Sequence, residues 1–385
     1  MATLTAPRRP VTNIRRNPGG VWHHVDMVLI ACVVAVSALG LLMIFSSTRG
    51  PEQPFDYSFL ERQIAFVVLG LGAMAASALF DYRKVRDYAL FLYGGAMFLL
   101  LAVLVVGSRQ RGTQGWFQLG PFQLQPSELA KLALIVAFAY LGAQFRHDVD
   151  LRRFGALVGL CLVPMALVMF QPDLGTTLVS AAVTVALLVV AGCRSRHLLA
   201  LGVAGVVAIA VVLQSGALDQ YQKDRLTTFV SQDSTVAAGP AEASAYNLNQ
   251  SKIAIGSGGL FGKGLFQGTQ TRLGNVPEQH TDFIFTAVGE ELGLLGAAGL
   301  LGLYSLIVWR VWRTAKLARD EFGSLLCAGV LAMFVFQIFE NVGMTMGIMP
   351  ITGIPLPFMS YGGSATITSF LAMGLVLNVH MRRFA

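Results

Sequence analysis

The residues best suited to chemistry lie in one short stretch, PEQHTDF, directly before an apolar run. It places Glu278, His280 and Asp282 ahead of Phe283. A carboxylate at such a boundary can take a proton from a hydroxyl while the apolar residues keep bulk water away, as general-base catalysis requires. Asp282 could instead cap the helix expected to begin at Phe283, since Asp is a favoured N-cap residue. Its ionisable neighbours favour the role of a base.

A second polar cluster is QPSELAK, at the start of another apolar run. Its spacing puts Glu128 and Lys131 on one helix face, behind Gln125 and a proline that a first turn tolerates. An ion pair at membrane depth is a functional candidate by default. The alternative is that it only stabilises the packing of helices. Asp173, in QPDLG, allows the same two interpretations.

The glycine-rich string GSGGLFGKG contains Lys263 and has the look of a phosphate-binding loop. Its register is wrong for one, because Ser257 stands five positions before Gly262 and Lys263 is followed by glycine. The glycines therefore predict tight turns and close backbone approach. The alternative is that their amides, with Lys263, bind a lipid pyrophosphate.

The segment GIMPITGIPLPFMSYGG, residues 347–363, contains three prolines and Ser360. It cannot form a continuous helix, yet it is too apolar for an exposed loop. Irregular backbone at membrane depth is tolerated where protein buries it or where it lines a wet cavity. We therefore expect it to turn back into the protein and wall a cavity. Four polar residues of the neighbouring runs are expected to hold helices together: Glu290, Glu291, Glu340 and Asn341.

Composition decides the fold class. The 385 residues are 55% hydrophobic and 13% charged, with a mean hydropathy of +0.63. Apolar runs near 20 residues recur, each long enough to span a bilayer as a helix. The net charge of +7 is scattered in short clusters, which argues against a nucleic-acid partner. The four cysteines lack metal-ligand spacing, so neither disulfides nor a structural metal is expected.

The chain is thus predicted to be an all-α polytopic membrane protein of about ten transmembrane helices, residues 26–381, between cytoplasmic tails at 1–25 and 382–385. The expected spans are 26–47, 64–80, 88–107, 128–145, 154–170, 173–192, 197–214, 283–309, 322–346 and 363–381. Most Lys and Arg residues fall on the side of the two termini, which the positive-inside rule makes cytoplasmic.

A large extracytoplasmic loop, residues 215–282, then joins the seventh and eighth spans. Its middle, SQDSTVAAGPAEASA, is expected to be mobile, and its end to form a short helix and turns. The polar clusters around Asp282, Glu128 and Asp173 face outward, where no ATP is available. Group transfer there needs an activated donor anchored in the membrane.

Five blocks together resemble the SEDS family, the group of RodA, FtsW and SpoVE. These blocks are QPSELAK, QPDLGTTLV, QSKIAIGSGGLFGKGL, PEQHTDFIFTAVGEELG and NVGMTMGIMPITGIPLPFMSYGGS, and they run in the family's order. The resemblance implies a ten-span glycosyltransferase of the bacterial cytoplasmic (inner) membrane that polymerises lipid II into peptidoglycan strands on the outer face. It implies as partners a class B penicillin-binding protein, which is a transpeptidase, and other membrane proteins of the elongation complex.

The resemblance also assigns residues. The family's essential aspartate falls at Asp282, and its polar cavity residues fall at Gln125, Glu128, Lys131 and Asp173. The chain departs from the family in GTQGW, where many members carry arginine before the tryptophan; Arg109 and Arg111 lie close enough in sequence to substitute. The HHVDMVLI start resembles the elongation branch, RodA, more than the division branch, FtsW.

The hypothesis is that Asp282 acts as general base on the acceptor sugar's 4-hydroxyl, which attacks the anomeric carbon of the donor. Cationic help for the departing pyrophosphate could come from a side chain or from a divalent cation, Mg²⁺ or Mn²⁺. The candidate substrate-binding residues are Gln125, Glu128, Lys131, Asp173, His280, Lys263, Arg109, Arg111 and Ser360. The rival hypotheses are a lipid II flippase and a scaffold without catalysis that recruits the transpeptidase.

Overall fold

The computed structural model describes residues 24–50, 55–110, 113–120, 122–145, 149–215 and 240–383. Long apolar helices dominate it because a run of about 20 apolar residues satisfies its own backbone hydrogen bonds only as a helix. The helices are α1 (Met27–Thr48), α2 (Ser58–Leu79), α3 (Tyr82–Asp87), α4 (Ala89–Val106), α5 (Pro126–Phe145), α6 (Leu151–Met169), α7 (Leu174–Val190), α8 (Ser195–Ser215), α10 (Pro240–Gly258), α11 (Thr269–Leu273), α12 (Ile284–Leu317), α13 (Glu321–Met346) and α14 (Gly363–Met381).

Each of the ten predicted spans coincides with one helix. Eight of the helices in the described part of the chain are long and apolar enough to cross a membrane, and α7 and α8 contain shorter apolar stretches. The prediction of a polytopic helical membrane protein is therefore confirmed.

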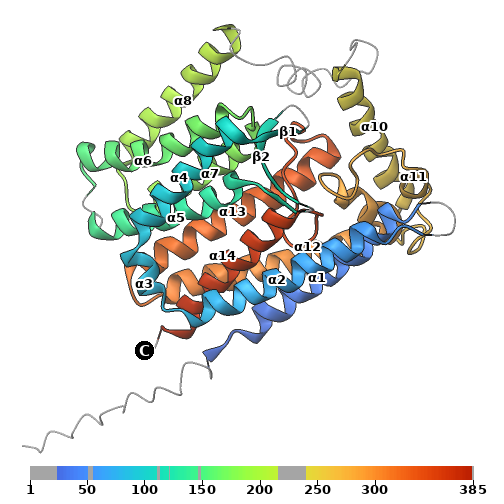
Figure 1. Ribbon diagram of the computed structural model, residues 1–385, viewed down its shortest axis with the longest axis horizontal. Helices are drawn as coiled ribbons and strands as arrows, with labels where there is room; N and C mark the ends of the chain where they lie inside the picture. The colour runs from blue at the N-terminus through green and yellow to red at the C-terminus, as the bar shows by residue number, and fades with distance from the viewer. Residues whose placement is uncertain are drawn as a thin grey trace, which may run out of the picture.

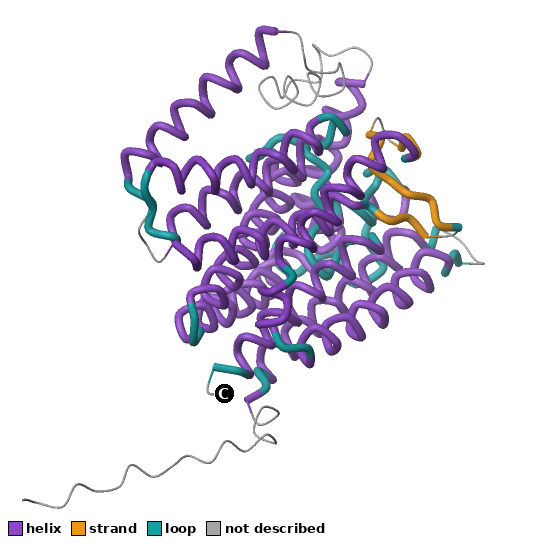
Figure 2. Tube along the Cα trace, turned by 60° about the vertical axis from the view of Figure 1, so that its left-hand side comes forward, coloured by secondary structure: helices purple, strands orange, loops and turns teal. Residues whose placement is uncertain are grey.

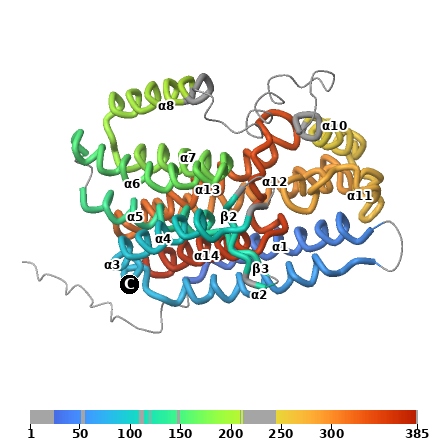
Figure 3. The backbone as a smooth tube through the Cα atoms, turned by 45° about the horizontal axis from the view of Figure 1, so that its top comes forward, coloured from blue at the N-terminus to red at the C-terminus, as the bar shows by residue number. Residues whose placement is uncertain are grey.

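The long helices pack side by side into one bundle, with α14 at its centre (Figure 1). Nearly every residue of α14 is buried, and it packs along α2. Glycine makes this close contact possible, because a Cβ on Gly374 would lie 2.4 Å from the Met74 carbonyl oxygen. Figure 3 shows α8 at the edge of the bundle, beside α6 and α7.

A small antiparallel sheet in the order β1-β2-β3 covers one end of the bundle (Figure 2). Its strands are β1 (Ser108–Gln110), β2 (Thr113–Leu119) and β3 (Phe122–Leu124). The sequence predicted no strands, because β1 and β3 have only three residues each and are fixed by pairing with β2 rather than by local propensity. We call this the sheet end of the bundle; the opposite end, where the C-terminus lies, is the terminal end.

The helix α12 is broken at Gly293, whose φ of 65° and ψ of −163° are not helical. The prediction of one continuous span over 283–309 was wrong on this point. Four backbone hydrogen bonds join the break to the glycine-rich string, and we call this pairing of residues 258–264 with 289–295 the glycine clamp. Its bonds are Lys263 N to Glu290 O (3.0 Å), Gly264 N to Glu291 O (3.0 Å), Leu294 N to Gly259 O (2.9 Å) and Leu295 N to Leu260 O (3.1 Å).

The glycines of the string allow this approach of two backbones. A Cβ on Gly262 would lie 2.1 Å from the Glu291 carbonyl oxygen, and the φ of Gly262 is +79°. The prediction of close backbone approach is confirmed.

Two adjacent carboxylates of α12 also fasten the segment around α11. Glu290 accepts hydrogen bonds from the Gln270 and Thr271 amides at 2.8 and 2.9 Å. Glu291 accepts one from the Ser46 hydroxyl at 2.5 Å and one from the Phe266 amide at 3.1 Å. The expectation that these glutamates hold the fold together is confirmed.

The other predicted irregular segment, residues 347–363, is non-helical up to Gly362 and largely buried, as expected. Asn341 holds it by donating to the Ile354 and Asp282 carbonyl oxygens, both at 2.8 Å. Within the large loop, residues 240–245, expected to be mobile, belong to α10. The rest of the SQDSTVAAGPAEASA stretch and most of the N-terminal tail lie outside the described residues.

Candidate active site

A cavity of about 370 Å³ lies at the sheet end, where α2, α5, α7 and the two irregular segments before α12 and α14 meet. Six of the predicted site residues line it, although they come from three distant parts of the sequence: Gln125, Glu128, Lys131, Asp173, His280 and Asp282.

One side of the cavity, which we call the charged wall, is formed by the starts of α5 and α7. The Lys131 ammonium contacts a Glu128 carboxylate oxygen at 2.7 Å, and the two residues are only 3% and 4% exposed. Asp173 caps α7 by accepting from the Thr176 amide and hydroxyl at 2.9 and 2.8 Å, and Gln125 donates to it at 3.3 Å. A buried ion pair and a carboxylate thus face one space, already oriented by hydrogen bonds.

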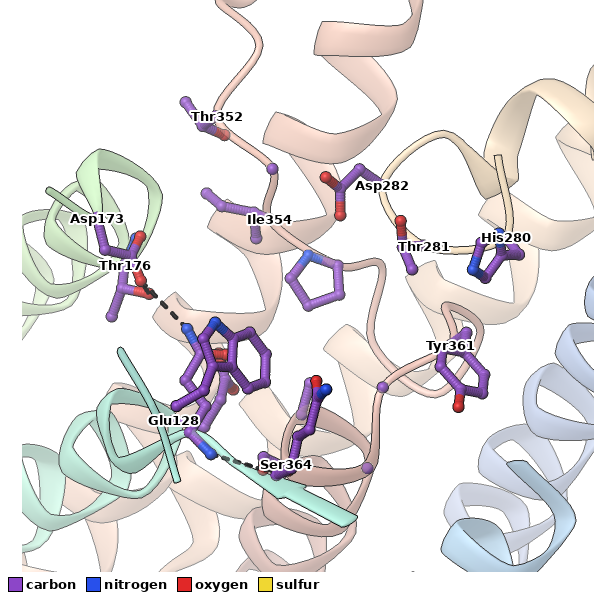
Figure 4. A pocket seen from close by; sticks show the side chains of 18 of the residues that line it. Glu128, Asp173, Thr176, His280, Thr281, Asp282, Thr352, Ile354, Tyr361 and Ser364 are labelled. Atoms are coloured by element: carbon purple, nitrogen blue, oxygen red, sulfur yellow. Dashed lines mark hydrogen bonds between the residues drawn. The ribbon is translucent and has the colours of Figure 1, made fainter. Parts of the chain in front are cut away.

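Asp282 lies in the turn before α12 and is half-buried. The turn is tight, because the amides of Thr281 and Asp282 both donate to the Glu278 carbonyl oxygen at 3.2 Å. The N-cap position of α12 is Phe283, so the alternative in which Asp282 caps this helix is not what the structure shows. Figure 4 shows the Asp282 carboxylate between Thr352 and Thr281 at the edge of the cavity.

The opposite side of the cavity is aromatic. The rings of Phe59, His280 and Tyr361 form a mutual cluster that we call the aromatic corner, with centroid distances of 4.8 Å (Phe59–His280), 5.3 Å (Phe59–Tyr361) and 5.6 Å (His280–Tyr361). The Tyr361 amide donates to the His280 carbonyl oxygen at 2.9 Å, which ties the two irregular segments together. Phe66 extends the cluster toward Phe122 of β3 at 5.8 Å.

On this side of the cavity, sequence reasoning found His280 but missed its neighbours. Arg62 lines it, yet the second span was expected to begin at residue 64, which left Arg62 in a loop. The spacing of Phe59, Arg62 and Phe66, at i, i+3 and i+7, marks one face of a helix and could have revealed them. Trp116 of β2 and Tyr361 were also missed.

The structure leaves two other predicted substrate-binding residues outside the cavity lining. Lys263 lies in the glycine clamp, where its ammonium pairs with Glu290 at 2.8 Å. The Ser360 hydroxyl accepts from the Leu356 amide at 2.8 Å and closes a buried turn. The Arg109 side chain and all of Arg111 lie outside the described residues. Within the described ranges, no group of three or more His, Cys, Asp or Glu residues is placed to hold a metal ion.

Fold and site together define a multi-pass membrane protein with a half-open cavity that offers a carboxylate, a buried lysine and aromatic rings at one end of its helical bundle. The profile of the cell cycle protein family of FtsW, RodA and SpoVE matches residues 26–384, and the chain belongs to this family.

Named relatives agree with the family assignment. The chain is 36% identical over 361 residues to the peptidoglycan glycosyltransferase MrdB of Escherichia coli K12, covering 94% of each chain. It is 34% identical to the probable peptidoglycan glycosyltransferase FtsW of Geobacter metallireducens, covering 93% of this chain and 95% of that one. Its fold is similar to a chain in a structure described as "structural coordination of polymerization and crosslinking by a peptidoglycan synthase complex", with a TM-score of 0.78, 31% identity, and 94% and 98% of the two chains covered.

Proposed function

We propose that this protein is a peptidoglycan glycosyltransferase that polymerises lipid II into glycan strands. The observation that carries the proposal is the position of Asp282, at the edge of a membrane-end cavity and between a wall with a buried lysine and a wall of aromatic rings. Relatives named peptidoglycan glycosyltransferases cover nearly the whole chain.

In the proposed reaction, Asp282 takes the proton from the acceptor sugar's 4-hydroxyl. The oxygen bonds to the anomeric carbon of the donor sugar as the bond from that carbon to the pyrophosphate oxygen breaks. The electron pair leaves with the lipid pyrophosphate, so an α-linked donor gives a β-linked product. General-base assistance typically contributes about 100-fold to 10,000-fold in rate.

The departing pyrophosphate needs positive charge nearby. Lys131 offers an ammonium on the charged wall. A divalent cation, Mg²⁺ or Mn²⁺, is the alternative, and removal of metal by a chelator distinguishes the two. Unchanged polymerisation after chelation would assign the charge to the side chains.

The proposed location is the bacterial cytoplasmic (inner) membrane, with both termini in the cytoplasm and the cavity facing outward. Basic residues at the terminal end support this orientation through the positive-inside rule. They include Arg83, Lys84 and Arg86 in α3, Arg313 and Lys316 near the end of α12, and Arg382 after α14.

The proposed partner is a class B penicillin-binding protein, with other membrane proteins of the elongation complex alongside it. An apolar groove of about 670 Å³ between α12 and α13, lined by residues such as Leu301, Trp309, Val335 and Phe339, is suited to a partner's membrane helix. Similarity to a chain of a synthase complex supports an assembly of this kind. The elongation role is part of the proposal; loss of the protein should then cause rounded rather than filamentous cells.

One assay tests the proposed function. Purified protein, with and without its partner, is incubated with labelled lipid II in detergent, where no membrane sides exist. Long glycan chains from the wild type and none from the Asp282→Ala variant support the enzyme. Absence of chains from the wild type with its partner, together with lipid II flipping in vesicles, would instead support the flippase.

A further inference from the structure

The two sides of the cavity differ in what they can bind. Figure 4 shows Glu128, Asp173 and Thr176 on one side, His280 and Tyr361 on the other, and Asp282 between them. A polymerase of lipid-linked sugars must hold two such molecules at once, with the hydroxyl of one near the anomeric carbon of the other. The asymmetry of the cavity therefore bears on which molecule lies on which side.

The aromatic corner packs against the core, yet it also forms part of the cavity surface. Phe59, His280 and Tyr361 are each only partly buried and line the cavity. By contrast, Phe334 and Phe358 stack at 5.4 Å with 1% and 2% exposure, as rings that serve packing alone do. An aromatic cluster that keeps part of its area open to a cavity can still bind a ligand there.

The chemistry of each wall selects a different part of the substrate. One face of a pyranose ring carries only C–H groups, which pack on the electron-rich face of an aromatic ring. A pyrophosphate instead requires charge-assisted hydrogen bonds from cations. The aromatic corner thus suits a sugar ring, and Lys131 on the charged wall suits a phosphate.

Position along the chain decides which sugar lies on the corner. His280 is two residues before Asp282 in the same tight turn, so a sugar stacked on the corner lies beside the carboxylate that takes the proton. The sugar whose hydroxyl loses that proton is the acceptor. The donor's bond to pyrophosphate breaks instead, and that bond needs the cation of the charged wall.

We propose that the aromatic corner is the binding subsite for the acceptor sugar, and that the charged wall is the subsite for the donor pyrophosphate. This assignment rests on the proposed function. Arg62 fits it, because it lies on the same face of α2 as Phe59 and supplies the acceptor side with a cation of its own. An acceptor that is itself a lipid pyrophosphate carries negative charge and needs such a cation nearby.

The experiment separates the two substrate roles. A lipid II analogue without its 4-hydroxyl can only donate, and an analogue with a non-cleavable phosphonate linkage can only accept. The Michaelis constant for each is measured with the other saturating. The test variants are Phe59→Leu and Tyr361→Leu; Phe59→Tyr and Tyr361→Phe are matched controls that keep the rings.

Each leucine variant should raise the KM for the acceptor analogue about 3-fold to 10-fold, as expected for one lost stacking contact. The KM for the donor analogue should stay unchanged, and the ring-preserving controls should behave like the wild type. A rise in the donor KM alone, or a fall in kcat with both KM values unchanged, would overturn the assignment.

Two other results are possible: a variant that does not fold and a wild-type protein without activity. If Phe59→Leu fails to fold, Tyr361→Leu carries the test. A wild-type protein that does not join the two analogues at all would refute the proposed function rather than the subsite assignment.

Discussion

The glycine clamp offers a quantitative test of how the fold holds the turn that carries Asp282. We predict that Gly262→Ala disrupts the clamp and that Gly259→Ala, three residues earlier, does so far less. Both glycines have positive φ, +79° and +57°, so alanine costs about 1–2 kcal/mol at either position. Only at Gly262 does the new Cβ meet backbone, 2.1 Å from the Glu291 carbonyl oxygen, whereas at Gly259 nothing lies within 4 Å.

The magnitude follows from the hydrogen bonds that must separate to relieve this clash. Two to four backbone bonds at about 1 kcal/mol each give an additional loss of about 2–4 kcal/mol for Gly262→Ala. A loss of this size should make the clamp hydrogen bonds open about 30-fold to 1,000-fold more often in Gly262→Ala than in Gly259→Ala. The amides that donate these bonds should then exchange faster by the same factor. The amides to follow are those that donate across the clamp: Lys263, Gly264, Leu294 and Leu295.

Hydrogen–deuterium exchange of the purified variants, followed by mass spectrometry of peptides from both sides of the clamp, measures this directly. Peptides from α14 serve as an internal reference, because that helix is central and nearly all of its residues are buried. Equal protection of the clamp amides in the two variants would refute the reasoning. Glycine would then be present at position 262 for its φ alone.

Three further predictions concern single side chains. Lys131→Met should lower the free energy of unfolding by about 3–5 kcal/mol, because it leaves the Glu128 carboxylate buried without its partner. The double variant Lys131→Met with Glu128→Gln should recover much of that stability in thermal unfolding, but not the activity. Arg62→Gln, at an exposed position, should leave the unfolding temperature unchanged and raise the KM for lipid II; an unchanged KM would remove Arg62 from the site. Burial raises the pKa of Tyr82 to about 12, above the value of about 10 in unfolded chains, so its contribution to stability is complete below pH 10 and is lost as pH rises toward 12. Tyr82→Phe should lose the bond to Asp320, worth about 1.5–3 kcal/mol, and weaken this alkaline dependence; an identical pH profile of unfolding would contradict it.

Much of the architecture was open to prediction because the membrane leaves few choices. Apolar runs of bilayer length must be helices, and prolines in an apolar segment must be buried irregular backbone, so the ten helices and the fold of residues 347–363 followed from the sequence. Six site residues were predicted to be functional, and the structure brings them to one cavity.

The rest depended on tertiary partners that the local sequence does not reveal. The break at Gly293 lies in a run that reads as one helix, and it exists because backbone from 30 residues earlier satisfies the freed groups. The same partner explains why Lys263 pairs with Glu290 instead of facing the cavity. The aromatic corner joins Phe59 to residues more than 200 positions away, so no local pattern could predict that these rings meet.

The central claim is that the Asp282 carboxylate acts as the base that drives glycan polymerisation. The most direct measurement is the rate of glycan strand formation from lipid II by the purified Asp282→Asn variant, which keeps the size and shape of the side chain but removes the basic oxygen. We predict a rate at least about 100-fold below that of the wild type, with an unchanged unfolding temperature. Strands made at the wild-type rate would contradict the account.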